Sequence, residues 1–351
     1  MNRRELALKQ FAAGTVIPAT PLVLDANRQF DPAGQKLLNG YYLEAGAGGI
    51  ATAVHSTQFE IRNPEFGLFE TVIGTVAESI DEYEARTGRV IVRVAGVCGR
   101  TEQAVKEAET AKRLGYDAVL LSPGGLNAES EDYLVERTRA VAAVLPVIGF
   151  YLQTAVGGRR LSYDYWLAVC NTPGVIGVKV AAFNRYATID VMRAAAFCNR
   201  PDEVALYTGN DDNIIADLTS TFTFPGEDGK TRTRRFVGGL LGHWSVWTHT
   251  VAEMFRRIKE NPDDPAWREL AAQVTDANGA IFDVANNFTG CISGIHEILH
   301  RQGLMPYIHC LCDKEHLSAG QSEEIDRVCR MYPHLTDDAF VKEYLRGRRE
   351  G

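Results

Sequence analysis

Lys179 is the residue whose setting most suggests chemistry. It stands near the C-terminal end of an apolar segment, residues 174–181, which reads GVIGVKVA. A buried ammonium is costly, and desolvation lowers the pKa of a lysine, so that the free amine can attack a carbonyl. A lysine whose ammonium reaches water at the rim of the strand is the structural alternative. The composition of the segment leaves both interpretations open.

Tyr151 is a second candidate, because it ends another apolar segment, residues 145–151 (LPVIGFY). A phenol beside an imine-forming lysine can carry protons during the steps that make and break the imine. This hypothesis requires the phenol and the amine to share one cavity. Taken alone, Tyr151 also fits a packed aromatic with a hydrated hydroxyl.

A third pattern suggests a different class of enzyme. Residues 296–300 read HEILH, and on a helix His296 and His300 would share a face and could hold Zn²⁺, with Glu297 as the base. The third ligand of the longer zinc-protease motif would fall on Pro306, so a carboxylate such as Glu315 would be needed instead. A zinc peptidase is therefore the rival hypothesis.

Short β-branched segments that alternate with amphipathic ones must position these residues. The predicted strands are residues 15–19, 49–54, 90–95, 118–121, 146–151, 175–180, 204–208 and 236–246. The predicted helices include residues 101–114, 131–144, 162–170, 188–198 and 211–220. A further helix is predicted at residues 31–45, where Asp31 is placed as the N-cap before Pro32 at the first helical position. Eight strands with intervening helices predict an α/β fold, a (β/α)₈ TIM barrel, with an open doubly wound sheet as the alternative.

The predicted domains follow from this repeat. Residues 1–260 form the barrel, with residues 222–236 as a polar hairpin inserted before the last strand, and residues 261–351 form C-terminal helices packed on the barrel. No glycine-rich nucleotide-binding motif follows a strand, so we expect no cofactor. Outside the HEILH motif the sequence suggests no metal site.

Composition restricts the possible partners. The chain has 351 residues, 45% of them hydrophobic, and a formal net charge of −8, which argues against nucleic-acid binding. We identify neither a secretory signal nor a segment apolar enough to span a membrane. Seven scattered cysteines fit a reducing compartment, so we expect a cytoplasmic protein without a disulfide framework.

Six segments of the chain together suggest a known family. They are residues 14–21 (GTVIPATP), 115–123 (GYDAVLLSP), 145–148 (LPVI), 175–179 (VIGVK), 208–212 (TGNDD) and 242–246 (GHWSV). In their order and spacing they resemble the dihydrodipicolinate synthase/N-acetylneuraminate lyase superfamily, whose members form a Schiff base with a 2-keto acid. The resemblance implies a TIM barrel with C-terminal helices. It also implies a homo-oligomer, either a tetramer or a dimer.

The resemblance assigns the imine to Lys179. The family's catalytic tyrosine lies 28 residues before that lysine and seven before a glycine, and Tyr151 with Gly158 satisfies both counts. Phe150 instead keeps the family's distance from Pro146. We assign the role to Tyr151 because it has a titratable hydroxyl, which places one extra residue in the segment 148–150.

The family motif after the second strand binds the carboxylate of the keto acid. In this chain the corresponding residues are 54–58 (VHSTQ), so Ser56 and Thr57 are expected to bind substrate. His55 replaces the family's proton-relay threonine. Its imidazole could relay protons, contact an anion or serve a structural role.

The family resemblance also implies substrate-binding residues at the last two strands. Gly209, Asn210 and Asp211 follow the seventh strand and could bind sugar-like hydroxyls, although Asp211 could equally cap the next helix. Trp244 and Ser245 lie at the last strand, where they are expected to line the pocket.

Two departures bear on the substrate. The family's paired tyrosines after the fourth strand are absent, and Val156 stands where the synthase has an arginine for a second carboxylate. We therefore expect a lyase that acts on pyruvate or a 2-keto-3-deoxy sugar acid, and not a true dihydrodipicolinate synthase. A dehydratase that uses the same imine is the close alternative, and a non-catalytic homologue that binds a keto acid is a further one.

Overall fold

A computed structural model describes residues 1–349 of the chain, which divides into two compact units. The first unit is Met1–Thr15 with Val92–Leu240, and the second is Val16–Ile91 with Leu241–Gly351. The predicted boundary at residue 260 falls within the second unit, where α9 ends. Residues 350–351, the end of the predicted C-terminal extension, lie outside the described part of the chain.

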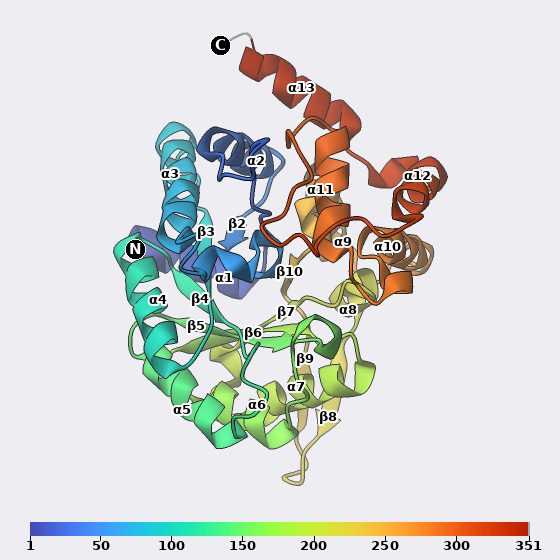
Figure 1. Cartoon of the computed structure of the whole chain (residues 1–351). Helices are drawn as coiled ribbons and strands as arrows, with labels where there is room; N and C mark the ends of the chain where they lie inside the picture. Colours follow the sequence, from blue (N-terminus) through green and yellow to red (C-terminus); the bar gives the residue numbers. More distant parts are fainter. Residues whose placement is uncertain (350–351) are drawn as a thin grey trace. The chain divides into compact units, whose positions relative to one another are not determined.

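The first unit alternates strands and helices along the sequence. Its helices are α1 (Arg3–Ala13), α4 (Thr101–Arg113), α5 (Glu131–Ala142), α6 (Tyr163–Asn171), α7 (Arg185–Phe197) and α8 (Ile214–Thr219). Its strands are β3 (Val92–Val97), β4 (Ala118–Leu121), β5 (Val147–Leu152), β6 (Val175–Ala181), β7 (Ala205–Thr208), β8 (Phe222–Pro225), β9 (Thr231–Arg234) and β10 (Gly238–Leu241). Figure 1 shows α4 to α7 along the outer side of the parallel strands β3 to β7.

The second unit holds two strands and most of the C-terminal helices. Its strands are β1 (Val16–Pro18) and β2 (Gly49–Thr52). Its helices are α2 (Pro32–Glu44), α3 (Phe69–Thr87), α9 (Thr248–Glu260), α10 (Trp267–Ile281), α11 (Cys291–Arg301), α12 (Gln321–Met331) and α13 (Asp338–Arg349). As predicted, Asp31 caps α2: its carboxylate accepts a hydrogen bond from Gly34 N, and Pro32 follows at the first helical position.

The order of the strands identifies the fold class. Eight strands hydrogen-bond in the order β1-β10-β7-β6-β5-β4-β3-β2. Apart from β8 and β9, which form a separate hairpin, the neighbours from β2 to β10 are thus strands that follow one another in the sequence. A parallel bridge between Ala19 and Ala51 joins the segments that contain the two end strands, β1 and β2. A doubly wound sheet reverses its strand order and leaves two free edges. The (β/α)₈ barrel is therefore confirmed, and the open sheet is excluded.

Strand composition explains the buried sheet. All six residues of β3 and all six of β5 are buried, as expected where a parallel strand packs on both faces. The segment expected to form a polar hairpin contains β8 and β9, which pair antiparallel from Phe222 with Arg234 to Pro225 with Thr231. The last predicted strand is too long, because β10 ends at Leu241 and residues His243–Ser245 form a 3₁₀ turn.

A buried carboxylate organises the C-terminal part of the second unit. Asp337, which is 4% exposed, accepts hydrogen bonds from Tyr41 Oη at 2.6 Å, His249 N at 3.0 Å and Gln302 Nε2 at 2.9 Å. These donors come from α2, α9 and the end of α11, and the next residue, Asp338, begins α13. Within residues 1–349, no helix is long and apolar enough to cross a membrane.

Candidate active site

Lys179 lies near the C-terminal end of β6, and its side chain is enclosed by apolar groups. The residue is 7% exposed, and its Nζ lies 4.5 Å from the centre of the Phe150 ring. Burial lowers the pKa of Lys179 from 10.5 to about 8, although the negative charge of Asp211 acts in the opposite direction. At pH 7 the side chain is then the free amine in roughly a tenth of the molecules, a far larger fraction than for an ordinary lysine.

Gly209 provides the space for the lysine. A Cβ at residue 209 would lie 2.7 Å from Lys179 Cε, 3.1 Å from its Cγ and 2.9 Å from Ala181 Cβ, so a larger residue would displace the lysine stem. Gly209 N also donates a hydrogen bond of 2.7 Å to Val180 O, which holds the two strand ends together. Close contact with the lysine stem explains why glycine occupies this position.

Tyr151 lies on the opposite face of the sheet from Lys179. Phe150 is the register partner of Lys179, and successive residues of a strand point to opposite faces. The Tyr151 ring stacks on Trp166 of α6 with 5.3 Å between ring centres, and its hydroxyl accepts a hydrogen bond from Leu161 N at 3.3 Å. Burial raises the pKa of the phenol. The prediction that this phenol stands beside the amine is therefore wrong.

The cause of this error is an irregularity in β6. Val147 pairs with Val175, but the next residue, Ile148, pairs with Gly177, so Ile176 is an extra residue in β6. Such a bulge lengthens one strand by a single residue. We had placed the extra residue in β5, which moved the predicted tyrosine to the wrong face. The unchanged spacing from Pro146 was the signal that pointed to Phe150.

Asn210 is a structural residue of the turn after β7. The side chain is fully buried: its Oδ1 accepts from Phe183 N at 3.0 Å, and its Nδ2 donates to Thr188 Oγ1 at 3.2 Å and to Asp217 Oδ2 at 2.9 Å. Asp217 is itself paired with Arg185. Because these bonds use both donors and the carbonyl of the amide, the prediction that Asn210 binds substrate is not supported.

Asp211 follows in the same turn and is 8% exposed. Helix α8 begins at Ile214, with Asn213 at its N-cap position, so Asp211 does not cap this helix. The Asp211 carboxylate instead raises the pKa of Lys179 through its charge. Lys179, Gly209, Asp211 and Phe150 therefore belong to one site in the first unit, in which a carboxylate and an amine act on each other.

The predicted carboxylate-binding residues lie after β2 in the second unit. Ala53 and Gln58 have φ angles of 57° and 68°, which are strained for residues other than glycine. Between them, Ser56 Oγ donates to Ala19 O at 2.6 Å, and Thr57 Oγ1 donates to Thr20 O at 2.7 Å. Each hydroxyl proton is therefore engaged by a backbone carbonyl, and binding a carboxylate would require that bond to break.

The remaining predicted residues of the second unit are less well suited to binding. Trp244 is fully buried and packs edge-on against Phe255 of α9, with 5.8 Å between ring centres. Ser245 Oγ donates to Ala19 O at 2.6 Å. His55, in contrast, is partly exposed, and its ring lies 6.1 Å from that of Phe59. Trp244 and Ser245 thus serve packing and backbone bonding within their unit.

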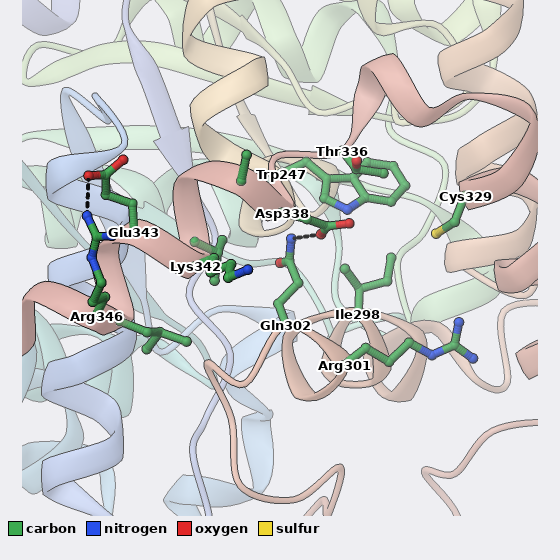
Figure 2. A pocket seen from close by; sticks show the side chains of 13 residues that line it. Trp247, Ile298, Arg301, Gln302, Cys329, Thr336, Asp338, Lys342, Glu343 and Arg346 are labelled. Carbon is green, nitrogen blue, oxygen red and sulfur yellow. Dashed lines mark hydrogen bonds and ion pairs between the residues drawn. The ribbon is translucent and has the colours of Figure 1, made fainter. Parts of the chain in front are cut away.

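Each unit contains a cavity, and Lys179 lines neither of them. In the first unit, a cavity of about 400 Å³ adjoins Tyr151, Arg160 and Tyr186 on the side of the sheet that faces α6 and α7. In the second unit, a cavity of about 790 Å³ lies among α11, α12 and α13. Figure 2 shows Trp247 and Ile298 on either side of the hydrogen-bonded pair Gln302 and Asp338, and its other lining residues include charged side chains.

The HEILH motif lies on α11, and its polar side chains contact other groups of the protein. Nδ1 of His296 lies 3.3 Å from Ile308 O, Nδ1 of His300 lies 3.0 Å from Met305 O, and Glu297 is paired with Arg301 at 2.8 Å. Burial lowers the pKa of His296 to about 4. Within the described residues, no three histidine, cysteine, aspartate or glutamate side chains come together in a manner that could hold a metal ion.

Comparisons with known proteins show what the chain is similar to. No family model matches the chain. A 4-hydroxy-tetrahydrodipicolinate synthase of Dechloromonas aromatica is 29% identical over 168 residues, which cover 43% of this chain and 54% of that protein. A synthase of the same name from a Cyanothece species is 24% identical over 251 residues, which cover 70% of this chain and 74% of that protein. The first of these matches thus spans about half the length of the curated relative.

Solved structures agree over nearly the whole chain. A dihydrodipicolinate synthase from Acinetobacter baumannii complexed with pyruvate has a TM-score of 0.72 at 17% identity, and the match covers 91% of this chain and 98% of that one. N-acetylneuraminate lyase from Mycoplasma synoviae has a TM-score of 0.67 at 17% identity, with the same coverage. These likenesses establish the fold, a (β/α)₈ barrel of the kind found in class I aldolase-type lyases. Together with the sequence matches, they support a resemblance, at low identity, to the dihydrodipicolinate synthase/N-acetylneuraminate lyase superfamily.

Proposed function

We propose that this protein is a lyase that forms an imine between Lys179 and the ketone of pyruvate or of a 2-keto-3-deoxy sugar acid. The observation that carries the proposal is the setting of Lys179, whose buried amine has a pKa lowered to about 8 near the C-terminal end of β6. Reactive residues of (β/α)₈ barrels lie at this end of the strands.

The chemistry follows from the amine. Its lone pair attacks the ketone carbon, and loss of water from the resulting carbinolamine leaves a protonated imine. The positive nitrogen then draws electrons from the neighbouring C–C or C–H bond. Cleavage of a C–C bond gives a lyase, and loss of a hydroxyl from the next carbon gives a dehydratase, so both alternatives share this intermediate.

The relatives support the choice of substrate class. The synthase from Acinetobacter baumannii was crystallised with pyruvate, and the Mycoplasma synoviae relative is an N-acetylneuraminate lyase. Val156 stands where the synthase has its carboxylate-binding arginine, which favours a substrate without a second carboxylate at that position. A true dihydrodipicolinate synthase activity is therefore not proposed.

Some expectations stay predictions. Carboxylate binding by Ser56 and Thr57 would require a hydroxyl to release its backbone acceptor, and a relay or anion-binding role for His55 depends on its partly exposed ring. Cytoplasmic location and homo-oligomer formation also stay predictions. Light scattering of the purified protein would test the second of these.

Borohydride trapping tests the function. Incubation with pyruvate and borohydride should add the mass of one reduced pyruvate, located by peptide mapping at Lys179. The adduct should be absent in Lys179→Met and present in Lys36→Met, which alters an exposed, ion-paired lysine. No adduct on the wild type would rule out the mechanism. An adduct without turnover of any 2-keto-3-deoxy acid would indicate a non-catalytic homologue, and activity lost on metal chelation would indicate the zinc peptidase.

A further inference from the structure

Imine chemistry requires a group that moves protons next to the amine, and the inward face of β5 provides none. Phe150, the register partner of Lys179, has no titratable hydrogen, and the phenol of Tyr151 points toward α6. The inference below rests on the proposed function. It names the group that carries protons at the same site.

The lysine stem leads toward the turn after β7. Contacts of 2.7 Å and 3.1 Å between a Cβ at residue 209 and the Cε and Cγ of Lys179 show that the stem runs along Gly209. Asp211 is two residues further on and is buried within the same turn. The turn that carries this carboxyl group thus begins against the lysine stem, and the charge of Asp211 acts on the amine.

The turn is held by the side chains on both sides of Gly209. Asn210 forms three side-chain hydrogen bonds, to Phe183 N, Thr188 Oγ1 and Asp217 Oδ2. Thr208 Oγ1 donates to the same carboxylate of Asp217 at 2.7 Å. Residues on both sides of Gly209 are thus anchored, which is the kind of support that a catalytic group needs.

We propose that Asp211 is the catalytic acid and base of the Lys179 imine, in place of the tyrosine of its relatives. The Asp211 carboxylate first takes a proton from the Lys179 ammonium, which frees the amine to attack the ketone. As the carbinolamine then loses its hydroxyl group, the Asp211 carboxylic acid gives this proton to the leaving oxygen, and the nitrogen lone pair forms the C=N bond. The resulting carboxylate then takes a proton from C3. The electrons of that C–H bond form C=C, and the C=N electrons return to nitrogen. Water and an enamine result, and Asp211 regains its proton. In cleavage, the same carboxylate takes the proton of the C4 hydroxyl as the C3–C4 bond breaks.

Exchange of the methyl protons of pyruvate for deuterium, followed by NMR in D₂O, measures the C3 step separately from imine formation. We expect Asp211→Asn to retain borohydride trapping after long incubation but to lose exchange by about 10²- to 10⁴-fold, the usual contribution of acid–base catalysis. Asp212→Asn is the matched control, since its side chain is exposed, and Tyr151→Phe should stay within about twofold of wild type. In the Asp211→Asn background, Phe150→Tyr should restore part of the exchange, because its hydroxyl would lie on the face of Lys179.

The outcomes separate the two proposals. No trapping in the wild type would overturn the imine itself. Normal trapping with undiminished exchange in Asp211→Asn would overturn only the role of Asp211. Loss of both signals in a folded Asp211→Asn, without any rescue by Phe150→Tyr, would also overturn it, because Asp211 would then only position the lysine.

Discussion

Replacing Lys179 by methionine should stabilise the fold at neutral pH. In the unfolded chain the lysine has its ordinary pKa of 10.5, and in the fold its pKa is about 8. Below pH 8 both states bind the proton, and the native state carries the full cost of the buried ammonium, about 3 kcal/mol for this shift. Between pH 8 and 10.5 only the unfolded state holds the proton, so the stability of the wild type rises with pH.

The difference between variant and wild type should therefore shrink as the pH rises. It should stay constant from pH 6.5 to about 8 and fall by about 2 kcal/mol between pH 8 and 9.5. The contact of the ammonium with Phe150 offsets part of the gain, on the order of 1 kcal/mol. Urea unfolding of both proteins across this range measures the effect, and Lys36→Met is the control. A variant less stable than wild type at pH 7, or a difference independent of pH, would refute the buried, destabilised amine.

Three further predictions concern neighbouring residues. Gly209→Ala should displace the lysine stem and slow imine trapping by up to about 100-fold. Gly74→Ala is the control, because a Cβ there meets nothing within 4 Å and should leave trapping unchanged. Equal trapping rates in both variants would refute the steric role of Gly209. Tyr151→Phe should leave the pH profile of turnover unchanged, and a lost limb of that profile would contradict its outward orientation. Ser56→Ala should lower the free energy of unfolding by about 1 kcal/mol, because the hydroxyl bonds to Ala19 O; an unchanged denaturation midpoint would argue against that bond.

The sequence predicted the fold because its strands are short, apolar and separated by amphipathic segments. The strand at residues 118–121 was predicted with the correct bounds, and Asp31 was recognised as a cap from its own chemistry and the proline after it. The last strand was overextended because Trp244 and Val246 are residue types common in strands. Nothing in their composition indicates the 3₁₀ turn at His243–Ser245.

The site was harder to predict, because it depends on the face to which each residue points. Lys179 could be identified from the cost of burying an ammonium in an apolar strand, which is a local property. Whether Phe150 or Tyr151 faces it depends on a one-residue bulge at Ile176, which is visible only in the pairing of β5 with β6. Asp211 was predicted to bind substrate, but its electrostatic effect on Lys179 becomes visible only when β6 and β7 lie side by side in the fold. Counting residues along a sequence cannot resolve such differences.

The carboxylate of Asp337 has a consequence for the handling of this protein. Three donors, one buried and two half-buried, converge on it from distant parts of the second unit, and each would lose its partner if the chain ended before this residue. Proteolytic trimming or a stop codon upstream of residue 337 should therefore give an aggregation-prone product, although the removed piece is hardly more than one terminal helix. Shortened expression fragments should therefore retain Asp337 and α13.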